Sequence, residues 1–152
     1  MRAALALCAA LMTTAPAVAM DARIDLARGA CEARCPVYSV SVGGDGAVVY
    51  EGRHYVQRRG RVERRIAPAA AAALLRRFSE RSFLDGPETI APGGPDCALD
   101  GRERSPIALT FRAGTTVKRL AVDGRCDGPA AQAARQLARA VDEAARLRGL
   151  TR

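Results

Sequence analysis

The sequence predicts an α+β domain in which one antiparallel sheet carries both helices on a single face. The expected order is a four-stranded meander, a helix, a hairpin and a C-terminal helix. Three observations predict this fold: apolar and polar residues alternate in several short segments, glycine-rich turns separate those segments, and two alanine-rich stretches begin with proline. One sheet with helices on one face buries all of these apolar residues.

The first half of the chain is expected to form the meander. Residues 23–28 and 37–42 alternate apolar and polar side chains, as half-buried strands do. The sequence GGDG at 43–46 provides residues that tolerate positive φ and therefore predicts a hairpin turn. Residues 47–57 form the returning strand, and 61–66 form the fourth strand.

The second half begins with a helix that we expect to start at Pro68 and to end at 83–85. Proline suits the first turn of a helix because its missing N–H has no partner there. A loop rich in proline and glycine follows, and then a hairpin at 105–122. Pro129 opens the last helix, for which Gly149 is the expected C-cap.

The N-terminus has the three-part pattern of a secretory signal peptide over residues 1–19. Arg2 precedes an apolar run at 3–12, and the small residues of 17–19 provide a cleavage site. The run is too short to span a bilayer, and nothing later in the chain is long and apolar enough to do so. We therefore expect a single mature domain, 20–152, that is periplasmic or secreted and has no transmembrane segment.

The formal net charge of +8 comes almost entirely from arginine. A nucleic-acid partner is not expected, because the protein is exported and its few aromatic residues are not interleaved with the basic clusters. Several arginines around the second turn predict a basic patch, and the favoured interpretation is a charged strand edge that discourages aggregation. The alternative is a surface that binds an anionic lipid, a polysaccharide or an acidic envelope protein. The patch consists of Arg53, Arg58, Arg59, Arg61, Arg64 and Arg65.

Four cysteines remain after removal of the leader: Cys31, Cys35, Cys97 and Cys126. An even number of cysteines in an oxidising compartment predicts two disulfides. Three pairings are possible, and we favour Cys31–Cys35 with Cys97–Cys126 because the first two are close in sequence. The longer bridge would restrict the unfolded chain more than the shorter one.

Cys31 and Cys35 also raise the alternative of a copper site or a thiol-redox centre, with His54 as a third ligand. The hairpin pattern that follows them does not fit the βαβ order of a thioredoxin-like fold. His54 lies among apolar neighbours, so we expect it to be half-buried and hydrogen-bonded. No metal and no cofactor is therefore expected.

Catalytic patterns are scarce in this sequence. It contains no G-x-S-x-G motif, and a single histidine leaves few ways to build a nucleophilic triad. The acidic residues Asp96, Asp100 and Glu103 are interrupted by arginines and are typical of a solvated loop that forms ion pairs. We assign no catalytic residue and lean towards a protein that is not an enzyme.

Cys31, Cys35 and the hairpin that follows them resemble a bacterial envelope family, the domain of unknown function 6438. The chain departs from the family at Glu32 and Ala33, where an aromatic residue and a glycine are usual. The resemblance implies a small exported domain without an established activity, so the leading hypothesis is a non-enzymatic binding or structural domain. Besides the cysteines, the residues that carry the resemblance are Pro36, Tyr38, Asp45, Gly46, Tyr50, Glu51, Gly52 and, more distantly, Asp96.

Overall fold

The structure, a computed structural model, describes residues 21–151, so the predicted signal peptide at 1–19 lies outside the described residues. The α+β fold is confirmed. The elements in chain order are β1 (Arg23–Arg28), β2 (Val37–Gly43), β3 (Ala47–His54), β4 (Gly60–Arg65), α1 (Pro68–Phe78), α2 (Arg81–Leu84), β5 (Thr89–Ile90), β6 (Ala98–Leu99), β7 (Ile107–Ala113), β8 (Thr116–Val122), β9 (Cys126–Asp127), α3 (Pro129–Ala144) and α4 (Arg148–Thr151).

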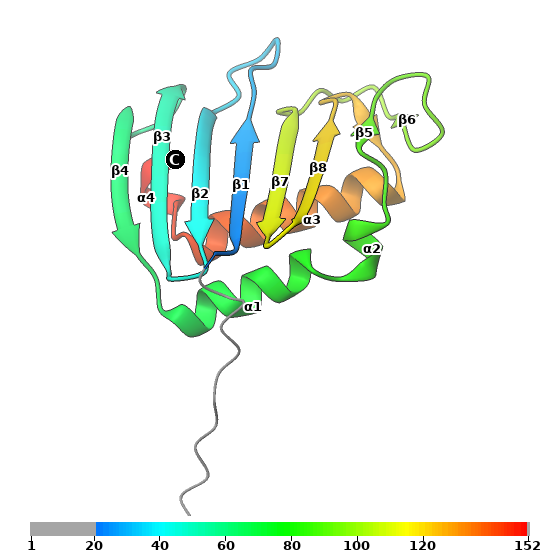
Figure 1. The fold of residues 1–152 in the computed structure, drawn as a ribbon. Helices are drawn as coiled ribbons and strands as arrows, with labels where there is room; N and C mark the ends of the chain where they lie inside the picture. The colour runs from blue at the N-terminus through cyan, green and yellow to red at the C-terminus, as the bar shows by residue number, and fades with distance from the viewer. Residues whose placement is uncertain (1–20, 152) are drawn as a thin grey trace, which may run out of the picture.

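The main sheet has seven strands in the order β4-β3-β2-β1-β7-β8-β5 (Figure 1). Its first four strands form the predicted meander, and the β7–β8 hairpin joins it where Leu26 lies opposite Val40 and Leu109. Strand β5 adds to β8 in parallel and was not predicted, because two residues are too few to show an alternation. A separate two-stranded ribbon pairs β6 with β9.

One face of the sheet is covered, and the hydrophobic core lies there. Strand residues that point to this face are almost fully buried, as at Ile24, Val42 and Tyr50. Helices α1 and α3 run across the strands and pack against each other (Figure 1). The Phe78 ring of α1 lies 6.3 Å from the Phe111 ring of β7, so the helical layer contacts the sheet directly. No helix within residues 21–151 has the length and apolar character needed to cross a membrane.

Both predicted helices end earlier than the sequence suggested. Helix α1 stops at Phe78, and Glu80 has an extended backbone with ψ 142°, so the chain turns before α2 begins. Helix α3 stops at Ala144, and Arg146 has a positive φ of 54°. Gly149 is therefore not a C-cap but lies inside α4. Each turn returns apolar side chains to the core, and this packing outweighs helix continuity.

The third strand is also shorter than predicted. Strand β3 ends at His54, because Arg53 forms a bulge opposite β2 and Tyr55 adopts a positive φ of 53°. The chain then crosses back over Gly52, where a Cβ atom would lie 2.0 Å from the Arg58 carbonyl oxygen. His54 is exposed, so the expectation that it is half-buried was wrong. The fourth strand runs one residue earlier than predicted, from Gly60 to Arg65.

Candidate functional site

Most residues of the family-like motif shape the first hairpin. The Tyr50 hydroxyl contacts two carbonyl oxygens, those of Arg58 at 3.1 Å and Leu150 at 3.3 Å, and so ties β3 to the following turn and to α4. The Asp45 carboxylate accepts a hydrogen bond of 3.0 Å from the Ala47 amide. Gly46 has a φ of +84°, which closes the turn between β2 and β3. These residues therefore fix the fold of the hairpin.

The remaining residues of the motif do not meet at one place. Glu51 lies on the uncovered face of the sheet, opposite Ser39 and Arg61. Pro36 is half-buried just before β2, and Asp96 is exposed in the loop before β6. The motif is therefore not the outline of a single active site.

A polar cluster that sequence reasoning missed lies at the edge of the core. The Arg28 Nε atom donates to the Tyr38 hydroxyl at 2.8 Å, and its Nη2 atom donates to Asp142 at 2.6 Å. The Tyr38 hydroxyl donates to the other carboxylate oxygen at 2.8 Å. Arg28 follows Leu26 on the buried side of β1, and Asp142 lies on the buried stripe of α3. A charged residue on an apolar face in both elements was the signal that could have found this cluster.

The electrostatics of this cluster favour one protonation state. Burial raises the pKa of the Tyr38 hydroxyl well above its ordinary value, so the tyrosine remains a hydrogen-bond donor. Burial alone would lower the pKa of Arg28, but the charge of Asp142 and the hydroxyl of Tyr38 outweigh it and raise that pKa. The side chains of Arg28 and Asp142 are only 16% and 23% exposed. The cluster is thus a fixed ion pair that joins α3 to β1 and β2.

The cysteines form two disulfides in the pairing that the sequence favoured, Cys31–Cys35 and Cys97–Cys126. The first closes a loop at the surface, where the Glu32 amide donates to both carboxylate oxygens of Glu103 at 3.1 Å. The second reaches the core, because Cys126 is fully buried. Each bridge therefore fixes a different loop at the same end of the sheet.

The two cysteines of the copper or thiol-redox alternative form a disulfide, which is compatible with a redox pair but not specific for one. His54 lies opposite Val37, close in sequence to Cys35, but both cysteines of that loop are oxidised. Within residues 21–151, no three His, Cys, Asp or Glu side chains are grouped so that they could hold a metal ion.

The predicted arginine patch surrounds strand β4 but does not form one cluster. Arg61 and Arg65 lie on the uncovered face and reach Glu63 at 2.7 Å and Asp45 at 3.7 Å. Arg64 points to the helical side and donates to the Arg146 carbonyl oxygen at 3.0 Å. The other three are exposed near the turn that joins β3 to β4, and they make no ion pair within the described chain: Arg53, Arg58 and Arg59.

Strand β4 is an edge of the sheet (Figure 1). Alternate residues of this strand therefore direct their backbone N–H and C=O groups away from the sheet. The Ile66 amide donates to the Gly46 carbonyl oxygen at 2.9 Å, which identifies the residues that bond to β3. Hydrogen-bonded pairs alternate along an antiparallel ladder, so the intervening residues direct their N–H and C=O groups outward. These residues are Arg61, Glu63 and Arg65, and no backbone group within 21–151 pairs with their outward sides.

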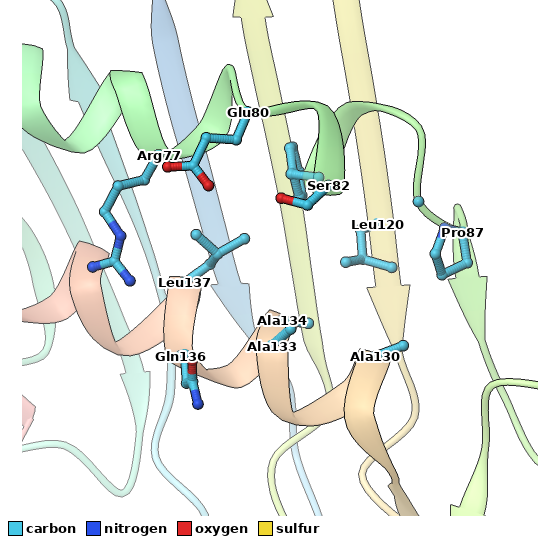
Figure 2. A pocket seen from close by; sticks show the side chains of 12 residues that line it. Arg77, Glu80, Ser82, Pro87, Leu120, Ala130, Ala133, Ala134, Gln136 and Leu137 are labelled. Carbon is cyan, nitrogen blue, oxygen red and sulfur yellow. The ribbon is translucent and has the colours of Figure 1, made fainter.

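A pocket of about 220 Å³ lies between α1–α2 and α3 (Figure 2). Its apolar floor contains the buried side chains of Phe83, Leu120 and Ala134. Figure 2 shows Arg77 and Glu80 together at one end of the pocket. Sequence analysis missed this site, because the pocket exists only where the chain turns between α1 and α2.

Comparison with known proteins identifies the family of this chain. A search of curated proteins finds no match to this chain. The profile of a protein family described as a domain of unknown function (DUF6438) matches residues 22–145, a range that includes every element from β1 to α3. The resemblance seen in the cysteine pair and the first hairpin is thereby confirmed, and the chain belongs to the DUF6438 family.

Proposed function

We propose that this protein is exported to the bacterial envelope and, without catalysis, binds an acidic extended segment of a partner protein along strand β4. The observation that carries the proposal is the outward backbone of Arg61, Glu63 and Arg65, which has no partner among residues 21–151 and lies beside a group of exposed arginines. Export rests on the signal-peptide pattern of residues 1–19.

The chemistry of the edge favours a strand over other anionic partners. Strand β4 offers donors and acceptors in alternation, and an added strand satisfies both kinds at once. Lipid head groups and polysaccharides would use the arginines but would leave the outward N–H and C=O groups to water. A partner strand would place its own side chains opposite Arg61, Glu63 and Arg65. The best complement is therefore an acidic, a basic and an acidic side chain at alternate positions.

A peptide pair tests this recognition directly. The first peptide alternates threonine with Glu, Lys and Glu, and the second has the same length with Lys, Glu and Lys at those positions. We expect the first peptide to bind more tightly, with an affinity that falls as salt rises, because exposed charges are screened. A version of the first peptide that is N-methylated at the residues whose amides face β4 should not bind, because it lacks the donors of the added strand.

Matched variants locate the binding surface on the protein. Arg61→Gln/Arg65→Gln should weaken binding of the first peptide up to about thirtyfold, since each of the two exposed ion pairs contributes up to about 1 kcal/mol. Arg76→Gln/Arg139→Gln removes the same charge from exposed positions on α1 and α3 and should leave binding unchanged. Equal binding of the N-methylated peptide would contradict strand addition. If the β4 variant self-associates and still binds the peptide, the edge is protective rather than a binding site.

The location is tested separately. Protein recovered from the periplasm or the medium of a bacterial host should begin at Met20, as N-terminal sequencing would show. A chain that keeps residues 1–19 and remains in the cytoplasm would contradict export.

A further inference from the structure

The pocket between α1–α2 and α3 has the size and the chemistry of a small-molecule site, and it is separate from strand β4. An apolar cavity of about 150 Å³ is known to hold a benzene molecule. The pocket measures about 220 Å³, so one phenyl ring or branched alkyl group fits beside a small polar group. This volume is below the roughly 300–1,000 Å³ of sites for drug-sized ligands, so the occupant is small.

The lining of the pocket changes from apolar to charged along its length. Pro87 and Ala130 line one end, and Leu120 and Ala134 line the middle (Figure 2). The opposite end carries Arg77 and Glu80 together. Neither side chain takes part in an ion pair or a side-chain hydrogen bond with another described residue. All other residues that line the pocket are apolar or uncharged.

We propose that this pocket binds a free amino acid with an apolar side chain, of about the size of phenylalanine. The ligand's side chain covers Leu120 and Ala134, its carboxylate meets the Arg77 guanidinium, and its ammonium group meets the Glu80 carboxylate. Arg77 and Glu80 are both exposed, so water solvates them in the free protein. One cation and one anion at the same end match a zwitterion, because a simple carboxylate or a simple amine would form an ion pair with only one of them.

A peptide carries one of these two charged groups at each end, an ammonium group at its N-terminus and a carboxylate at its C-terminus. Phenylalanine derivatives with one group blocked distinguish a free amino acid from either end of a peptide. Phenylalanine amide retains the ammonium group and represents an N-terminal residue. N-acetylphenylalanine retains the carboxylate and represents a C-terminal residue. Each should bind the mature chain about threefold more weakly than phenylalanine, because each loses one exposed ion pair. Glycine, which lacks the apolar group, should not bind.

The measurement is an NMR titration of the mature, disulfide-bonded protein. Phenylalanine should cause saturable shifts at the amides of residues 77–87 and 130–137, with a dissociation constant on the order of 1 mM for a ligand of this size. An absence of saturable shifts at these residues would overturn the proposal. A blocked ligand that binds as well as phenylalanine would overturn the zwitterion and assign the site to the matching chain end.

Variants show whether the ligand occupies the pocket itself. Ala133 lines the pocket and is exposed on α3, so Ala133→Leu fills the site without a cost to the core. This change should abolish binding of phenylalanine, whereas Ala73→Leu, at an exposed helical alanine outside the pocket, should leave it intact. Unchanged binding to Ala133→Leu would contradict the proposed location. Arg77→Gln and Glu80→Gln should each weaken phenylalanine about threefold, and should weaken the ligand that lacks the matching charge much less.

Discussion

The two faces of the seven-stranded sheet are built from alternate residues of the same strands, yet their composition differs sharply. On the covered face, Val40 and Tyr50 are at most 2% exposed and pack under the helices. On the uncovered face, small side chains such as those of Ser41 and Ala27 stay in contact with solvent, and so does Val117, which is 48% exposed. The covered face therefore holds the fold together, and the uncovered face contributes little to it.

Charges on the uncovered face are arranged along the strands and not around one point. Asp25 joins Arg23 and Arg112, each at 2.7 Å, while Arg119 on β8 makes no ion pair with another described residue. Beside them lies a shallow hollow of about 410 Å³ lined by small side chains such as Ala108. These residues lie outside the hydrophobic core, so we expect substitutions on this face and at the β4 edge to leave the domain folded.

The largest effect is expected in the helical layer above the covered face. Phe78 is fully buried and contacts the rings of Phe83 at 5.1 Å and Phe111 at 6.3 Å. Phe78→Ala should lower the free energy of unfolding by about 3–5 kcal/mol, because it leaves a cavity between helix and sheet. Urea unfolding followed by circular dichroism measures this change. A loss below about 1 kcal/mol would show that the covered face is not the main source of stability.

The two disulfides, which lie at one end of the sheet, should differ in how much they stabilise the fold. Removing Cys97–Cys126 should cost about 3.6 kcal/mol, and removing Cys31–Cys35 about 2 kcal/mol, because the first closes the longer loop in the unfolded chain. The measured difference should exceed this estimate, since Cys126 is buried in the core while the other bridge lies in a surface loop. Unfolding of the two double-alanine variants tests the order. Equal losses would contradict it.

The polar cluster at the edge of the core should have an intermediate effect. Tyr38→Phe removes the hydroxyl that contacts both Arg28 and Asp142, so those charges lose a partner in a partly buried place. We expect a loss of about 1–3 kcal/mol. Tyr55→Phe, at a tyrosine that is 58% exposed, is the matched control and should change little. If the two variants lose similar amounts of free energy of unfolding, the hydrogen bonds of the Tyr38 hydroxyl do not stabilise the fold.

Sequence periodicity predicted the covered face well because each strand of the meander has enough residues to show an alternation. It could not predict features that depend on distant contacts. Arg28 and Asp142 are separated by 114 positions, and no local pattern pairs them. Strand β5 is too short to detect, and the pocket depends on the turn at Glu80, which tertiary packing imposes on a helical sequence.

The candidate sites, too, were predictable only where neighbouring residues in the sequence determine them. The positions of the arginines in the sequence placed them near one hairpin, and the short separation of Cys31 and Cys35 predicted the disulfide pairing. The sequence could not show that Arg64 points to the helical side while Arg61 points away from it, because this depends on the exact register of β4. It also misplaced His54, since the bulge at Arg53 changes the face on which the following residues lie.

A smaller, pH-dependent effect is expected in the loops beside the sheet. A hydrogen bond from Arg104, with help from the Arg102 amide, lowers the pKa of Asp100 to about 2. The unfolded chain binds the proton at a higher pH, so the charged carboxylate stabilises the fold above about pH 4, and this contribution disappears as the pH falls towards 2. An NMR titration of the Asp100 carboxyl group should show the low value. In Arg104→Ala the pKa should return towards its ordinary value, and an unchanged pKa would contradict the assignment.

The smallest effect is expected on the uncovered face, and two adjacent residues of β2 give the sharpest contrast. Ser41 makes no side-chain hydrogen bond to another described residue, so Ser41→Ala should change the free energy of unfolding by less than about 0.5 kcal/mol. Val40→Ala, one position earlier on the covered face, should cost about 2 kcal/mol because that side chain is only 2% exposed. Urea unfolding of both variants under one set of conditions provides the measurement. If Ser41→Ala costs as much as Val40→Ala, the uncovered face also carries stability, and its residues cannot vary independently of the fold.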